Sequence, residues 1–71
     1  MARQLKSTEV IRILQHNGFR FVSQRGSHQK WRNSHTGKQV IVPYHKGKEL
    51  PSGTLRSIVD GSGIPEKEFY R

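Results

Sequence analysis

Residues 19–43 read FRFVSQRGSHQKWRNSHTGKQVIVP, and this stretch decides the fold. Aromatic and β-branched residues recur there in short runs separated by polar, glycine-containing segments, which is typical of strands joined by tight turns. The strands are expected at residues 19–23, 27–33 and 38–42. Pro43 should end the last strand because a proline cannot donate a hydrogen bond to a neighbouring strand. Since the connections are short, the strands should pair antiparallel in chain order.

A first helix is expected before this stretch, over residues 8–17, with Ser7 as its N-cap. Apolar residues recur there at the spacing of one helix face. These residues are Val10, Ile13 and Leu14, with Ile11 at the margin. Gly18 follows at the position where a helix commonly ends in the left-handed conformation. Such an amphipathic helix needs a sheet or a second helix to cover its apolar face.

A second helix is expected from Pro51 or Ser52 to Gly63, after a polar loop at residues 44–50. Residues 65–69 are expected to add a short helical turn with a proline at its first position. The order is therefore α-β-β-β-α, and two helices can cover one face of a three-stranded antiparallel sheet while the other face stays in water. This α+β layout resembles that of the double-stranded-RNA-binding domain.

Size and charge limit the possible classes of function. The chain has 71 residues, which indicates a single domain over residues 1–71, and only 31% of them are hydrophobic. So small a domain has no room for a buried catalytic cavity, and any chemistry is expected on an open surface. Lys and Arg total 13 against 5 Asp and Glu, a formal charge of +8, which favours nucleic acid as the partner.

The chain has no cysteine, which excludes disulfides and thiolate zinc sites. No apolar run approaches the ~18 residues that a membrane span needs. The N-terminal segment MARQLK lacks the apolar core of a signal peptide. We therefore expect a cytoplasmic protein that does not contact a membrane.

Side-chain alternation divides the second expected strand into two faces. Trp31 is its one large apolar side chain, so the Trp31 face should lie against the helices. The charged residues of the strand then project from the open face: His28, Lys30 and Arg32. Arg25, expected in the preceding turn, and Lys38, across the hairpin, would add positive charge. An ordinary solvated strand face is the alternative interpretation, and the Gly-Ser turn directly before His28 favours the functional one.

A histidine on a cationic strand is suited to acid–base chemistry on RNA. Imidazole titrates near neutral pH, and Arg25, Lys30 and Arg32 can hold a phosphodiester and offset charge in the transition state. RNA carries its own nucleophile, the 2′-hydroxyl, so the protein needs to supply only a base, an acid and positive charge. Because the sequence has no carboxylate cluster for magnesium, we expect neither a metal nor a cofactor.

The second proton-transfer group stays open at this point, since one histidine cannot act as base and acid at once. His45, a lysine and water are the alternatives, whereas His16 and His35 are expected to be ordinary surface residues. The residues expected to contact RNA are Arg25, Ser27, Lys30, Arg32, Lys38, His45, Lys46 and Lys48.

Three motifs, taken in order, resemble the HicA toxins of bacterial toxin–antitoxin modules. They are Gly26-Ser27-His28 with an aromatic residue three positions on, Val40-Ile41-Val42-Pro43, and Gly53-Thr54-Leu55-Arg56-Ser57-Ile58. The resemblance spans residues 7–69. It implies a double-stranded-RNA-binding-like fold, ribosome-independent cleavage of mRNA, and growth arrest when the toxin is unchecked.

The resemblance also implies roles for individual residues and partners. The family's catalytic histidine maps onto His28, and the family implies a HicB antitoxin that covers this residue. Many members carry a second histidine directly after the first, where this chain has Gln29. Alternation points Gln29 away from His28, so we expect no loss of activity. The protein is expected to be monomeric when free and to oligomerise only through the antitoxin.

Two other functions are compatible with the same sequence. One is a non-catalytic RNA-binding module of the same fold, and the other is a protein whose basic surface serves to dock a protein partner. A double-stranded-RNA binder contacts RNA through its helices and a loop. The basic residues here gather on the strands and loops instead, which favours the endoribonuclease.

Overall fold

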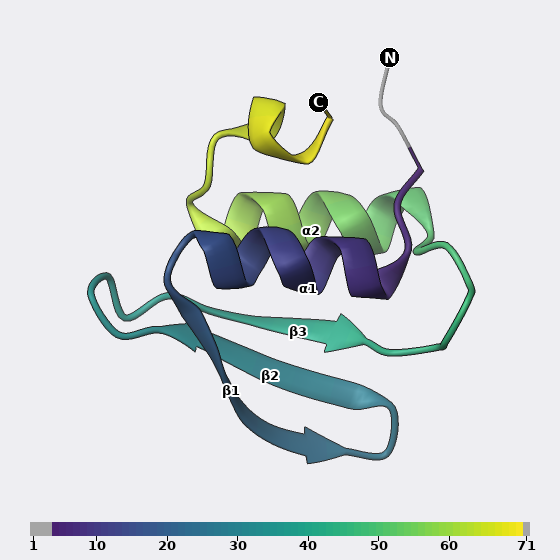
Figure 1. The fold of residues 1–71 in the computed structure, drawn as a ribbon, viewed down its shortest axis with the longest axis horizontal. Coiled ribbons are helices and arrows are strands. Elements are labelled where there is room, and N and C mark those ends of the chain that lie inside the picture. The colour runs from purple at the N-terminus through teal and green to yellow at the C-terminus, as the bar shows by residue number, and fades with distance from the viewer. Residues whose placement is uncertain (1–3, 71) are drawn as a thin grey trace.

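A computed structural model describes residues 4–70. The prediction that the N-terminal segment is not a signal peptide rests partly on residues 1–3, which lie outside the described residues. The elements are α1 (Ser7–His16), β1 (Phe19–Arg25), β2 (His28–Asn33), β3 (Gln39–Pro43), α2 (Ser52–Ser62) and a 3₁₀ turn, η1 (Glu66–Phe69). Both α-helices lie on the same face of the sheet, and no other element covers the opposite face in the described range (Figure 1). The predicted α-β-β-β-α order and the α+β double-stranded-RNA-binding-like fold are confirmed.

The strands pair antiparallel in chain order, with β2 in the middle, as predicted. β1 is longer than predicted because Arg25 pairs with His28, so the turn contains only Gly26 and Ser27. The prediction that Arg25 lies in the turn is therefore wrong. β3 starts one residue late and includes Pro43, which pairs with His28. An edge strand tolerates a proline because its outer side donates to no neighbour.

A β-bulge interrupts β1 at Val22. Phe21 pairs with Trp31 and Ser23 pairs with Lys30, so Val22 is an extra residue in the ladder. A bulge shifts the alternation of the residues that follow it. Phe19 and Phe21 therefore share the face of Trp31, whereas Ser23 and Arg25, at the same odd spacing, share the opposite face.

The hydrophobic core fills the space between the helices and the sheet. Trp31 is 5% exposed, which confirms that its face lies against the helices. The core consists of Leu5, Val10, Leu14, Phe19, Trp31, Val40, Val42, Leu50, Leu55, Ile58, Val59, Ile64 and Phe69. These side chains all point to one side of the sheet or lie above it, so the core lies on the helix side of the sheet.

A buried asparagine joins α1 to the β2–β3 hairpin. The Asn33 side-chain amide donates to the Asn17 carbonyl at the end of α1, at 3.0 Å. Its side-chain oxygen accepts from the backbone N–H groups of His35 and Thr36, at 2.8 and 3.2 Å. Asn33 is 8% exposed, so all these partners are needed to offset its burial.

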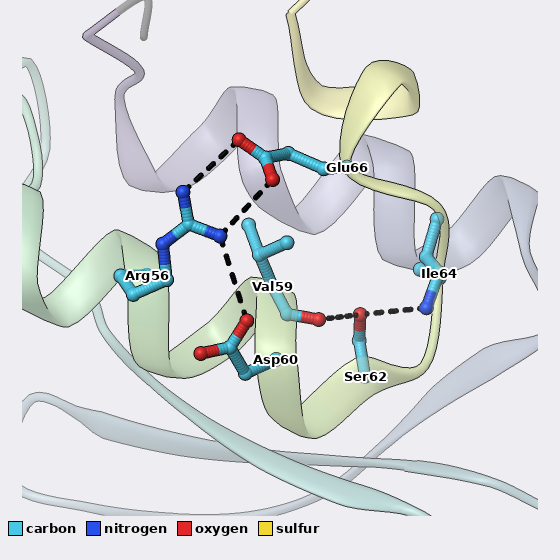
Figure 2. Close-up of polar contacts among 6 residues, drawn as sticks. All are labelled: Arg56, Val59, Asp60, Ser62, Ile64 and Glu66. Carbon is cyan, nitrogen blue, oxygen red and sulfur yellow. Dashed lines mark hydrogen bonds and ion pairs between the residues drawn. The ribbon is translucent and has the colours of Figure 1, made fainter.

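Polar contacts join α2 to η1 and to the segment between them (Figure 2). Gly63 ends the helix at φ 73°, as predicted, and the Ser62 hydroxyl donates to the Val59 carbonyl and accepts from the Ile64 N–H. Arg56 donates to both carboxylate oxygens of Glu66, at 3.1 and 3.0 Å. These hydrogen bonds hold the pKa of Glu66 below its usual value. The short turn starts at Glu66, one residue after the proline that was expected to begin it.

Ser7 does not cap α1, which corrects the sequence prediction. The helix begins at Ser7 itself, and the extended Lys6 is the N-cap. Lys6 forms an isolated antiparallel β-bridge with Glu49 through its backbone. The backbone N–H of Lys6 also donates to the Glu9 carboxylate at 2.8 Å. The Ser7 hydroxyl is buried and has no hydrogen-bond partner among the residues that the structure describes.

Replacing Ser7 by alanine is therefore expected to raise the free energy of unfolding by about 1 kcal/mol. Alanine removes an unpaired buried hydroxyl and favours the helix. Urea denaturation measures the change as a shift of the midpoint at constant slope. Thr8→Ala, at an exposed neighbouring position, is the control and should change stability by less than about 0.5 kcal/mol. A loss of about 0.5–2 kcal/mol in Ser7→Ala would restore the N-cap assignment.

Candidate active site

The uncovered face of the sheet carries a group of basic side chains. His28, Lys30 and Arg32 alternate along β2 with the buried Trp31 and Asn33, so they project to the opposite side. Their partners on β1 are Arg25, Ser23 and Arg20, in that order. We call the side chains of Arg20, Arg25, His28, Lys30 and Arg32 the cationic face.

The bulge at Val22 brings Arg25 to the cationic face. With regular alternation from Phe19, Arg25 would point toward the helices, beside Phe21. The extra residue reverses this, and Arg25 stands directly opposite His28 in the ladder. His28 therefore has a guanidinium across the strand pair and an ammonium two residues along its own strand. The sequence analysis correctly expected Arg25 near His28, but it assigned Arg25 to the turn, whereas Arg25 is the last residue of β1.

Arg20 is a member of the cationic face that the sequence interpretation missed. It pairs with Arg32 at the end of the sheet away from His28. The signal was present in the sequence, because Arg20 lies between Phe19 and Phe21, and the two aromatic residues indicate the side of β1 that faces the helices.

His28 lines a surface depression with residues from all three strands. The depression has a volume of about 460 Å³. Its lining residues are Ser23, Gln24, Arg25, His28, Lys30 and Ile41. Histidine, lysine and arginine therefore converge on one open site, where a phosphodiester can lie between cations and within reach of an imidazole.

The loop after β3 lies at the His28 end of the sheet. Pro43 pairs with His28, and the next residue, Tyr44, donates its N–H to the Ser27 carbonyl at 2.6 Å. This bond joins the β1–β2 turn to the loop. Three predicted RNA-contacting residues follow in the loop, and all three are exposed: His45, Lys46 and Lys48. The structure thus brings Ser27 and these loop residues to the end of the sheet where His28 stands.

Lys38 does not join the cationic face. Its carbonyl accepts from the N–H of Asn33, a residue of the buried face, at 2.9 Å. Its side chain lies along Gly63, where an added Cβ would stand 2.9 Å from Lys38 Cδ and Cε. Lys38 is therefore on the helix side of the sheet, so the expectation that it adds charge to the open face of β2 is wrong, whereas its predicted contact with RNA stays a prediction. Lys38 directly precedes Gln39, the first residue of β3, which pairs with Arg32 of the cationic face. Since side chains alternate along a strand, the residue before Gln39 points to the opposite side.

The other histidines lie away from the site. His16 is exposed at the end of α1, and His35 is exposed in the β2–β3 hairpin loop. Across residues 4–70, His, Cys, Asp and Glu side chains form no group of three or more that could hold a metal ion. No helix in the same range is long and apolar enough to cross a membrane.

Comparison with known proteins identifies the family of this chain. The family model described as HicA toxin of bacterial toxin–antitoxin matches residues 7–64, which include both helices, the sheet and all five residues of the cationic face. A curated protein of Pseudomonas fluorescens (strain Pf0-1), named "Probable mRNA interferase HicA", is 36% identical over 62 residues, covering 87% of this chain and 100% of that protein. By the extent of both matches, the chain belongs to the HicA toxin family.

Proposed function

We propose that this protein is the toxin of a toxin–antitoxin pair and that it is an endoribonuclease which cleaves mRNA without the ribosome. The observation that carries the proposal is the position of His28, which stands opposite Arg25 and beside Lys30 on an uncovered sheet face. Membership of the HicA family supports the toxin role, and the mRNA interferase name of the Pseudomonas relative supports RNA as the substrate.

The proposed reaction uses the nucleophile that RNA itself supplies and needs no metal ion. His28 takes the proton from a 2′-hydroxyl, and the 2′ oxygen attacks the adjacent phosphorus. The bond from phosphorus to the 5′ oxygen breaks, and that oxygen takes a proton from a second group. Arg25 and Lys30 hold the non-bridging oxygens, where negative charge develops in the transition state. The products are a 2′,3′-cyclic phosphate and a 5′-hydroxyl.

The second proton donor is one of the groups at the same end of the sheet. His45 is the side chain best placed by the chain path, because Pro43, two residues earlier, pairs with His28. A loop lysine or a water molecule is the alternative, and the comparison of His45→Ala with Lys46→Ala distinguishes them.

The proposed partner of the free toxin is a HicB-type antitoxin that covers the cationic face. The formal charge of +8 suits an acidic docking surface on that partner. We propose further that the toxin is monomeric when free and that it acts in the cytoplasm, where mRNA is available.

A non-catalytic double-stranded-RNA binder is less well supported. Such a domain places basic side chains of its helices on phosphates. Arg56 is the one basic residue of α2, and it is engaged by Glu66 and by Asp60, at 3.5 Å. The basic residues of the sheet are on the face opposite to the helices.

Incubation of the purified protein with ribosome-free mRNA in EDTA tests the proposal. Shortened RNA fragments that accumulate with time are the expected result. Intact RNA together with a salt-sensitive mobility shift would support the non-catalytic binder instead. Intact RNA without a shift would support a surface that docks only protein.

Arg32→Ala is expected to weaken RNA binding to a similar extent for all sequences and to lower the slope of log affinity against log salt concentration by about 0.7, the value for one phosphate contact to a single strand. Binding of 2′-O-methyl RNA, which has no free nucleophile, measures this slope without cleavage. Arg12→Ala removes an exposed arginine from α1, away from the cationic face, and is the matched control. Equal slopes for the two variants would show that Arg32 contacts no phosphate.

A further inference from the structure

The uncovered sheet face is charged on two strands and uncharged on the third. β1 and β2 contribute the whole cationic face. β3 contributes to the same side Gln39, Ile41 and Pro43, which pair with Arg32, Lys30 and His28. A substrate that lies across this face therefore meets cations along two strands and a neutral, partly apolar surface along the third.

Ile41 is the apolar centre of the β3 side. It is 44% exposed, although its neighbours Val40 and Val42 are buried on the opposite face. Phe21 and Val22 are the other exposed large hydrophobic residues in residues 4–70, and both lie at the β1 bulge. Of these three, Ile41 alone lines the depression that contains His28.

We propose that Ile41, with Pro43, forms a nucleobase-binding subsite beside the phosphate-binding side chains of β1 and β2. The inference rests on the proposed endoribonuclease function. Neighbouring strands are about 4.8 Å apart, so a phosphate held by Lys30 places its own nucleotide beside Ile41. The apolar side chain of Ile41 covers one face of the base, while the basic side chains of β1 and β2 bind the sugar–phosphate backbone of the RNA.

The chemistry of this subsite defines the class of substrate. A base can lie on Ile41 only if it is unstacked and unpaired, so the ligand is single-stranded RNA rather than a duplex. Ile41 and Pro43 carry no side-chain donor or acceptor. The subsite therefore requires a base at this position but reads no Watson–Crick edge, and the cleavage should tolerate different bases there.

The test compares two uncleavable ligands with the full-length protein. One is a 2′-O-methyl RNA trinucleotide, and the other is the same sugar–phosphate chain without bases. The wild-type protein is expected to bind the trinucleotide about tenfold more tightly, since burial of a few apolar groups contributes about 0.8 kcal/mol each. Ile41→Ala should reduce the ratio of the two affinities, trinucleotide over abasic chain, by about three- to tenfold. It should leave the affinity for the abasic chain unchanged.

Two further variants make the outcome specific. Ile41→Thr keeps a β-branched side chain in the strand but lowers its apolar area, and it should also reduce the ratio. Val22→Ala shortens a side chain of similar exposure outside the depression and should leave the ratio unchanged.

An unchanged ratio in both Ile41 variants would overturn the subsite. Ile41 variants that weaken only the binding of an antitoxin would likewise overturn it, and would assign the apolar patch to the protein partner. A wild-type protein that prefers the trinucleotide but leaves mRNA intact would overturn the proposed endoribonuclease and leave the subsite standing.

Discussion

Replacement of His28 by alanine is expected to lower the rate of RNA cleavage by about 10²–10⁴-fold, the usual contribution of a general acid or base. Alanine cannot take the proton of the 2′-hydroxyl, whereas Arg25 and Lys30 stay in place to bind the phosphate. The variant should therefore still bind RNA. Its expression should no longer arrest growth.

The fold of this variant should be unchanged. His28 is exposed, so the substitution removes no buried side chain. Circular dichroism and the unfolding midpoint check this, and single-turnover cleavage of a labelled RNA measures the rate. His16→Ala and His35→Ala remove exposed histidines that are off the cationic face and should cleave at the wild-type rate. A His28→Ala protein with the wild-type rate would move the catalytic role to another group.

Phe69→Ala is expected to lower the free energy of unfolding by about 3–5 kcal/mol, the cost of truncating a buried phenylalanine. Phe69 is 1% exposed, in the short turn η1, and it belongs to the same core as Leu5 and Leu14. Small domains have a total stability of about 5–15 kcal/mol. The substitution should therefore remove a large fraction of the total stability, although Phe69 lies beyond the residues 7–64 that the family model matches.

Urea denaturation of the two proteins measures this cost. Lys67→Ala, an exposed residue of the same turn, is the matched control and should change stability by less than about 0.5 kcal/mol. A loss below about 1 kcal/mol for Phe69→Ala would indicate that the C-terminal turn is not part of the core, because it falls well short of the usual cost of such a truncation.

The order of elements and the face of β2 were predictable because they depend on periodic patterns. Apolar residues at helical spacing determined the helices, and the single tryptophan of β2 determined which side of that strand is buried. Both signals come from burial of large side chains, which dominates the free energy of folding. His28, Lys30 and Arg32 followed directly from that choice of face.

Features that depend on backbone hydrogen bonding were not predictable from the same patterns. The bulge at Val22 has no glycine to mark it, and it depends on how β1 pairs with β2. It nevertheless decides that Arg25 faces the same side as His28. Ser7 has the residue type of an N-cap, but the pairing of Lys6 with Glu49 starts the helix one residue earlier.

Lys38 illustrates the limit of assigning a residue to one face of a sheet from its charge alone. The sequence shows a lysine next to β3, and only the backbone hydrogen bond from the Asn33 N–H to its carbonyl shows that it lies on the helix side. Arg20 shows the opposite error, because it was passed over although it shares the face of Arg32. A one-residue change of phase reverses the face of every side chain in a strand.

The central claim is that His28 promotes attack by the 2′-hydroxyl of RNA on the cationic face. The most direct measurement is cleavage, in EDTA, of two matched oligonucleotides that differ by one 2′-deoxy sugar at the cleaved position. We expect the all-ribose strand to give a 2′,3′-cyclic phosphate and a 5′-hydroxyl, and the 2′-deoxy strand to stay intact at that position. Cleavage of the 2′-deoxy strand at the same position, or an all-ribose strand that stays intact, would contradict the claim.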